Sequence, residues 1–326
     1  MILRLLAALV CAAAELILWM NTPIFRLSFP RRRESIACWR ERLCHGFPPA
    51  RERQDGVVAF LVFSVFSDSI SRLGRSIVHG IFLAGVCTLA LPPALAQQAD
   101  YAREKRWAEE ITPAILVGDP VYLALPAKPS DQKFLAIHTT HPKPRAAVIV
   151  VHGMGVHPDW NLINALRSQL AEQEYTTLSV QMPVLASDAK GEAYPALFPE
   201  AAARLQAAVD FLKDQGHRKI ALVSHSMGAR MANHFLVNGG AVDAWVAVGI
   251  STGIYEQPQR LTMPVFDIYG EKDFPAVLKL APARAAAIQR VRGSGQMSVA
   301  GADHYFNGAE AQLVRQVKRF LDSATR

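Results

Sequence analysis

One short segment limits the folds open to this chain more than any other. Residues 220–223 are apolar and predict a buried strand, the sequence Ser-His-Ser-Met-Gly follows at 224–228, and residues 227–237 have the composition of a helix. A strand that turns this tightly into a helix lifts a serine side chain above the edge of a sheet. The crowded turn requires small residues, which Ser224 and Gly228 supply. We therefore interpret Ser226 as a candidate nucleophile.

Two further residues complete a catalytic set. A serine hydroxyl is a poor nucleophile at neutral pH and needs a base, which in turn needs an orienting acid. The strand-like residues 264–270 lead into Asp273, and a second strand-like segment around residues 297–299 leads into His304. The sequence therefore predicts Ser226 as nucleophile, His304 as general base and Asp273 as the acid that orients the base.

Several nearby residues compete for these roles. Asp267, inside the strand before Asp273, and Asp243, before the preceding strand, are alternatives for the acid. His152 is a weaker alternative for the base. His225 adjoins the nucleophile, so we expect its ring to point elsewhere and to serve in local packing or in lining the pocket.

A glycine-rich turn upstream completes the pattern. The apolar residues 146–151 predict a strand that ends in His152-Gly153-Met154-Gly155. With the chain order Ser, Asp, His, these motifs resemble the α/β-hydrolase superfamily over roughly residues 123–321. In detail the chain resembles an uncharacterised bacterial branch of that superfamily with exported members. The resemblance implies an oxyanion hole formed by the backbone N–H groups of Met154 and Met227, with His152 and Gly153 in the same substrate-binding region.

The order of the predicted elements defines the fold class. Strands alternate with helices from residue 114 to residue 321, which predicts an α/β fold with a mostly parallel central sheet and helices on both faces. Residues 251–263 are too few for a large lid domain. The longer loop at 185–198 contains Tyr194 and Phe198, which we expect to line one side of the substrate-binding cleft.

The first 96 residues have a different character. Residues 71–96 resemble a secretory signal peptide: Arg72 and Arg75 precede an apolar stretch, and Ala94-Leu95-Ala96 fits the cleavage rule. An uncleaved membrane anchor is the alternative. Residues 1–70 form an N-terminal extension that we expect to be disordered or to lie upstream of the true start codon. Residues 97–326 then form the α/β-hydrolase domain.

Charge and cysteine content exclude several function classes. Residues 1–75 hold 11 arginines, no lysine and 6 acidic residues, a net charge of +5 out of +7 for the chain, so the predicted domain is nearly neutral. It has no basic stripe with interleaved aromatic residues, which argues against nucleic-acid binding. All four cysteines precede residue 96, which excludes a thiolate zinc site in the domain. Phosphate-loop and dinucleotide-binding motifs are missing, so we expect neither a metal nor a cofactor.

Together these features predict an exported serine hydrolase that cleaves carboxylic esters through an acyl-enzyme. The expected partner is a small-molecule or polymeric ester, with transient membrane association through the N-terminal hydrophobic segment. The expected location is periplasmic or secreted, with anchoring in the inner membrane as the alternative. The competing hypothesis is a catalytically inactive envelope protein that kept the fold for a binding or structural role.

Overall fold

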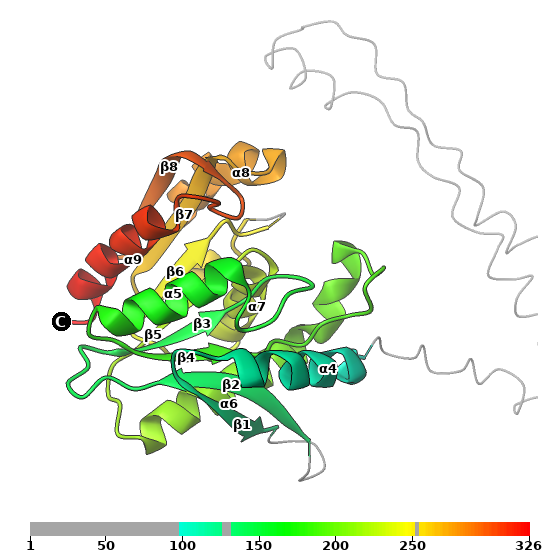
Figure 1. Ribbon diagram of the computed structural model, residues 1–326. Coiled ribbons are helices and arrows are strands. Elements are labelled where there is room, and N and C mark those ends of the chain that lie inside the picture. Colours follow the sequence, from blue (N-terminus) through cyan, green and yellow to red (C-terminus); the bar gives the residue numbers. More distant parts are fainter. Residues whose placement is uncertain (1–97, 126–131, 252–253) are drawn as a thin grey trace, which may run out of the picture. The chain divides into compact units, whose positions relative to one another are not determined.

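A single eight-stranded sheet organises the domain (Figure 1). The computed structural model describes residues 98–125, 132–251 and 254–326, so the predicted extension and signal peptide lie outside the described residues. The strand order in the sheet is β1-β2-β4-β3-β5-β6-β7-β8. The strands are β1 (Asp119–Ala124), β2 (Lys133–Thr139), β3 (Ala147–Val151), β4 (Thr176–Val180), β5 (Ile220–His225), β6 (Ala244–Val248), β7 (Val265–Lys272) and β8 (Gly295–Asp303).

The sheet is mostly parallel, as the alternation of strands and helices predicts. Only β1 with β2 and β2 with β4 pair antiparallel, while every neighbouring pair from β4 through β3 to β8 is parallel. The carboxyl ends of β3, β5, β6, β7 and β8 therefore meet at one edge of the sheet. Ligand sites of open α/β sheets form at that edge.

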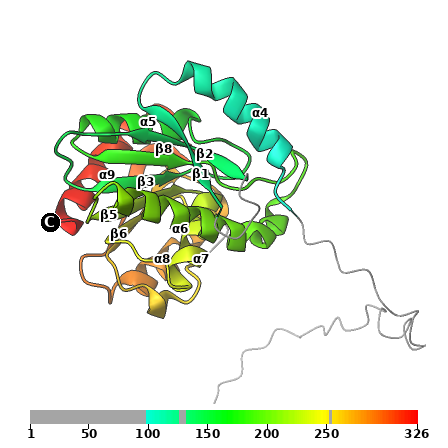
Figure 2. The same cartoon turned by 90° about the horizontal axis from the view of Figure 1, so that it is seen from below.

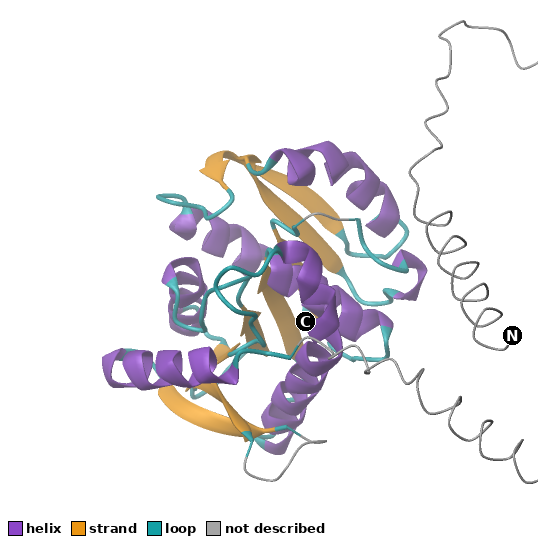
Figure 3. Ribbon diagram, turned by 90° about the vertical axis from the view of Figure 1, so that its right-hand side faces the viewer, coloured by secondary structure: helices purple, strands orange, loops and turns teal. Residues whose placement is uncertain are grey.

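Helices cover both faces of the sheet (Figures 2 and 3). Side chains of α5 and α9 pack on one face, and those of α6, α7 and the end of α8 pack on the other. Successive residues of β3 alternate between these two cores, which explains why its sequence is apolar throughout. The helices are α4 (Tyr101–Ile111), α5 (Asn161–Glu172), α6 (Phe198–Asp214), α7 (Met227–Val237), α8 (Pro275–Ile288) and α9 (Glu310–Ala324).

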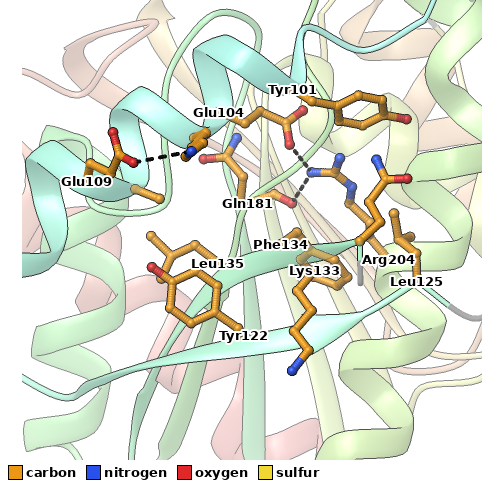
Figure 4. A pocket seen from close by; sticks show the side chains of 13 residues that line it. Tyr101, Glu104, Glu109, Tyr122, Leu125, Lys133, Phe134, Leu135, Gln181 and Arg204 are labelled. Atoms are coloured by element: carbon orange, nitrogen blue, oxygen red, sulfur yellow. Dashed lines mark hydrogen bonds and ion pairs between the residues drawn. The ribbon is translucent and has the colours of Figure 1, made fainter. Parts of the chain in front are cut away.

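Helix α4 has a highly charged sequence, yet one of its faces is buried. Glu104 on its inner face is buried and accepts a hydrogen bond from Arg204 of α6 at 2.8 Å and one from the backbone N–H of Val184 at 3.2 Å. Burial raises the pKa of Glu104. Figure 4 shows this pair beside a cavity of about 370 Å³ between α4 and strands β1 and β2. These hydrogen bonds join α4 to α6 and to the segment after β4.

Two element boundaries differ from the sequence-based expectation. The strand expected over residues 114–125 begins only at Asp119, because Pro113 lies in a short 3-10 helix, η2 (Thr112–Ala114), before it. Helix α8 continues through Pro282, although a proline inside a helix usually interrupts or kinks it.

The connection between β6 and β7 contains no large lid in its described residues. Apart from the two undescribed positions 252–253, it consists of loop and one short 3-10 helix, η4 (Pro258–Arg260). Within the described parts of the chain, no helix is both long and apolar enough to cross a membrane.

Candidate active site

Ser226 stands on a strained turn between β5 and α7. Its backbone has φ +57° and ψ −120°, a conformation uncommon for a residue with a side chain, and its N–H donates to the carbonyl of Val248 at 2.9 Å. Gly228 makes the turn sterically feasible, because a Cβ at that position would lie 2.2 Å from the carbonyl oxygen of His152. The turn therefore holds the Ser226 side chain at the carboxyl edge of the sheet.

A chain of two hydrogen bonds joins the three predicted catalytic residues. His304 Nε2 lies 2.9 Å from Ser226 Oγ, and His304 Nδ1 lies 2.6 Å from Asp273 Oδ1. With Nδ1–H donating to the carboxylate, Nε2 is free to accept the serine proton. Asp273 is 4% and His304 2% exposed, so the polar chain reaches solvent mainly through the partly exposed Ser226. The geometry is that of a nucleophile, a base and an orienting acid.

The backbone holds the Asp273 carboxylate in place. Oδ1 also accepts the N–H of Phe274 at 2.7 Å, and Oδ2 accepts the N–H of Gly270 at 3.4 Å. Gly249, which the sequence reasoning missed, makes room for the pair: its φ is +52°, and a Cβ there would lie 3.0 Å from Asp273 Oδ2 and 3.3 Å from the His304 ring. A glycine directly after the apolar run of β6, at the carboxyl end of a central strand, was the feature of the sequence that could have indicated this role.

The rival acids have other partners. Asp267 and Arg284 form a fully buried ion pair at 2.9 Å, and Gln296 donates a further hydrogen bond to the same carboxylate. Burial raises the pKa of Asp267. Asp243 accepts the backbone N–H of Ile220 at 2.8 Å. Since neither carboxylate contacts His304, we assign both to structural roles: Asp267 joins β7 to α8, and Asp243 joins the start of β6 to that of β5.

The predicted oxyanion residues lie on either side of the nucleophile. Met227 is the first residue of α7, where backbone N–H groups have no acceptor within the helix. Gly153 lies directly against Ser226, because a Cβ built on it would be 3.1 Å from Ser226 Cβ. Met154 follows Gly153, and its side chain is 45% exposed. A substrate carbonyl above Ser226 would thus approach backbone from both segments.

The ring of His152 is buried, so its side chain does not line an open cleft, contrary to what its assignment to the substrate-binding region had implied. Its ring is fully buried, with Nδ1–H donating to the carbonyl of Gly153 at 2.8 Å and Nε2 accepting the N–H of Met182 at 2.9 Å. Burial lowers its pKa to about 3, so the ring is neutral. His152 instead fastens the loop after β3 to the segment after β4.

The expectation that Tyr194 and Phe198 line the cleft also needs correction. Both are buried, at 2% and 3% exposed, and both belong to the core under the sheet. Tyr194 lies in the 3-10 helix η3 (Gly191–Leu197) and Phe198 is the first residue of α6, and both elements place these side chains in the core. Gly191 of η3 lies close to the predicted oxyanion residues, because a Cβ there would be 3.7 Å from Met227 Cε and 3.8 Å from Met154 Sδ.

His225 is buried beneath the base. Its Nε2–H donates to the backbone carbonyl of His304 at 2.9 Å, and the two ring centroids are 4.8 Å apart. Burial, with a smaller effect from His304, lowers the pKa of His225 to about 4. His225 therefore supports the loop that carries the base, which agrees with the packing role expected for it.

Two aromatic residues that the sequence reasoning missed surround the base. The Phe274 ring stacks on the His304 ring with centroids 4.0 Å apart, and Tyr305 meets His304 edge to face at 5.1 Å. Each directly follows a predicted catalytic residue, which was the signal that could have drawn attention to them.

Metal-binding groups are not clustered in this region. Within residues 98–125, 132–251 and 254–326, no group of three or more His, Cys, Asp or Glu side chains could hold a metal ion.

Replacing the two candidate acids separates catalysis from stability. Asp273→Asn should keep the fold and lower kcat by about 10³- to 10⁴-fold, because the imidazole loses control of its tautomer. Asp267→Asn should lower the free energy of unfolding by about 3 kcal/mol or more, because Arg284 stays buried without its charge partner. Active-site titration and urea unfolding measure the two effects. Full turnover in Asp273→Asn, with loss of turnover in a stably folded Asp267→Asn, would assign the acid to Asp267 instead.

Comparison with solved structures identifies the fold. The chain matches Est1E from Butyrivibrio proteoclasticus with a TM-score of 0.50 and 14% identity, over 63% of this chain and 98% of that one. Est1E with ferulic acid bound gives 0.51 and 15%, over 63% and 98%. A dienelactone hydrolase from Anabaena variabilis gives 0.50 and 19%, over 64% and 99%. The chain therefore has the α/β-hydrolase fold.

Sequence comparison adds a family without an assigned activity. A model of a protein family of unknown function (DUF3530) matches residues 186–323, less than half of the chain. The matched part includes Ser226, Asp273 and His304 but not the loop after β3. No curated protein matches the chain.

Proposed function

We propose that this chain is a serine hydrolase that cleaves carboxylic esters through an acyl-enzyme. The observation that carries the proposal is the pair of hydrogen bonds from Ser226 Oγ through His304 to Asp273, at 2.9 and 2.6 Å. Three side chains from three separate loops converge at the carboxyl edge of an α/β-hydrolase sheet. An inactive protein has no evident use for so strained a backbone at Ser226.

The proposed reaction has two halves. In the first, Ser226 Oγ attacks the ester carbonyl carbon while His304 Nε2 accepts the serine proton. The backbone N–H groups of Met154 and Met227 stabilise the negative charge that develops on the carbonyl oxygen, each contributing about 3 kcal/mol. His304 then donates its proton to the departing alkoxide, which leaves as the alcohol. In the second half water attacks the acyl-enzyme by the same path and releases the acid.

The proposed substrate is a small-molecule or polymeric ester. The large lid that many lipases insert has no counterpart in the described residues between β6 and β7, which favours an open site. The nearly neutral domain favours an uncharged substrate over nucleic acid. No metal or cofactor takes part in the proposed reaction.

The proposed location is the periplasm or the exterior of the cell. We expect the signal peptide at residues 71–96 to be removed, so that the mature protein begins at Gln97. N-terminal sequencing of the exported protein tests this expectation. A mature species that begins upstream of Arg72, or one that stays in the membrane fraction after an alkaline wash, would instead support the membrane-anchored alternative.

Fluorophosphonate labelling tests the proposed activity. The protein is expressed with its own leader, and the mature form, residues 97–326, is purified. This form should react covalently with the probe at Ser226 and hydrolyse p-nitrophenyl esters. A series of rising acyl chain length would define the acyl preference. If a folded protein neither reacts with the probe nor hydrolyses any ester, the inactive envelope protein becomes the better hypothesis.

A further inference from the structure

Apolar side chains are exposed around the catalytic residues. Seven large apolar side chains are exposed in the described part of the chain, and three of them, Met154, Phe274 and Tyr305, adjoin the site. Phe274 is 46% and Tyr305 41% exposed, although the His304 ring between them is buried. Exposing apolar surface to water is unfavourable by about 25 cal/mol for each Å². A cluster of exposed apolar side chains beside a site therefore indicates a binding surface.

Phe274 and Tyr305 form a corner of fixed geometry. Their rings are perpendicular, at 86° with centroids 6.0 Å apart, and both contact the His304 ring. Phe274 is the N-cap residue of α8, so its backbone is set by the helix. Tyr305 is held from behind by Trp160, edge to face at 5.7 Å. We call these two side chains the aromatic corner.

The chemistry of the base assigns the corner to one half of the substrate. His304 Nε2 donates its proton to the departing alkoxide, so the alcohol part of an ester must lie beside His304 when the bond breaks. The aromatic corner is built on His304 itself. Met154 and Met227, by contrast, lie with Gly191 on the oxyanion side of Ser226. The alcohol part of the substrate therefore meets aromatic side chains, and the acyl part meets the two methionines.

We propose that the aromatic corner binds an aromatic group in the alcohol part of the substrate ester. The favoured substrates are then esters of arylalkyl alcohols, such as benzyl esters. This inference rests on the proposed function. A flat ring can stack on Phe274 while meeting Tyr305 edge to face, the two arrangements that aromatic pairs prefer. A saturated ring of the same size fills the corner without either interaction.

Matched pairs of esters test the proposal. Benzyl acetate and cyclohexylmethyl acetate place the aromatic or the saturated ring in the alcohol part, and methyl phenylacetate and methyl cyclohexylacetate place it in the acyl part. We expect kcat/KM for benzyl acetate to exceed that for cyclohexylmethyl acetate by about threefold to tenfold, the range of one or two aromatic contacts. The acyl-side pair should show no comparable preference.

Variants assign the preference to the corner. Phe274→Leu and Tyr305→Leu should each reduce the ratio of benzyl to cyclohexylmethyl rates toward one. Using a ratio within one variant cancels any general loss of activity, and fluorophosphonate titration counts the active sites. Tyr122→Leu is the matched control, because Tyr122 is an exposed tyrosine on β1, at the opposite edge of the sheet from β8. Its ratio should equal that of the unsubstituted protein.

The outcomes separate this inference from the proposed function. Ester hydrolysis without a preference in the alcohol-side pair, or a preference that survives in both corner variants, overturns the aromatic corner alone. A preference confined to the acyl-side pair also overturns it and assigns the ring to the methionine side. If none of the four esters is cleaved and the probe does not label Ser226, the proposed function fails and this inference fails with it.

Discussion

Ser226→Ala should lower kcat for ester hydrolysis by on the order of 10⁵- to 10⁶-fold and abolish fluorophosphonate labelling. In the proposed reaction the hydroxyl forms the covalent bond, and alanine offers no substitute. His304→Ala should be about as damaging, since an unassisted serine hydroxyl is almost inert at neutral pH. The double variant should be hardly slower than either single variant, because members of a triad act as a unit.

Stability should change little in Ser226→Ala. Ser226 is partly exposed, so the loss of its hydroxyl leaves no cavity in the core. A water molecule can then donate a hydrogen bond to His304 Nε2 in place of the serine hydroxyl. The melting temperature should stay within a few degrees of that of the unsubstituted protein. Differential scanning calorimetry beside single-turnover kinetics checks both expectations. If the losses in the two single variants instead multiplied in the double variant, Ser226 and His304 would not share one mechanism.

Much of the fold follows from local sequence patterns. The apolar runs of β3, β5 and β7 are long enough to be buried on both faces, and the small residues around Ser226 allow only one kind of turn. The side-chain directions at that turn follow from the backbone, so the partners of Ser226 could be sought at the ends of later strands. Asp273 and His304, the two residues singled out there, lie within hydrogen-bond distance of each other in the structure.

The errors concern side chains whose direction depends on tertiary packing. Tyr194 in η3 and Phe198 at the start of α6 both lie in the core, although the loop predicted for this segment gave no sign of it. The burial of Glu104 in a charged helix likewise depends on partners far along the chain, Arg204 and the backbone N–H of Val184. Phe274 and Tyr305 border the site because two loops meet at His304. No local pattern encodes such long-range encounters, whereas period and turn chemistry are local.

Acid should destabilise the domain through its two buried site histidines. Burial lowers the pKa of His152 to about 3 and that of His225 to about 4, while both should titrate near 6.5 in the unfolded chain. Between those values the unfolded chain binds more protons than the folded one, so the free energy of unfolding falls as the pH falls. The loss is about 1.4 kcal/mol per histidine for each pH unit below about 6.5, or roughly 5 kcal/mol by pH 4.5.

That loss is a substantial part of the stability of a typical domain, so the free energy of unfolding should be clearly lower at pH 4.5 than at pH 6.5. Glu104 and Asp267 act in the opposite direction, since burial raises the pKa of each and the folded state then binds their protons more readily. A variant comparison isolates the histidine contribution. His225→Asn should reduce the loss of unfolding free energy between pH 6.5 and 4.5 by on the order of 3 kcal/mol.

Urea unfolding at half-unit steps of pH measures these slopes directly. His141→Asn is the matched control for the loss of a histidine outside the core, because His141 lies in a surface turn where its Nδ1 accepts only the N–H of Lys143. Equal slopes in the unsubstituted protein and His225→Asn would contradict the buried, neutral state of this histidine. The hydrogen bond from its Nε2–H to the His304 carbonyl would then need another explanation.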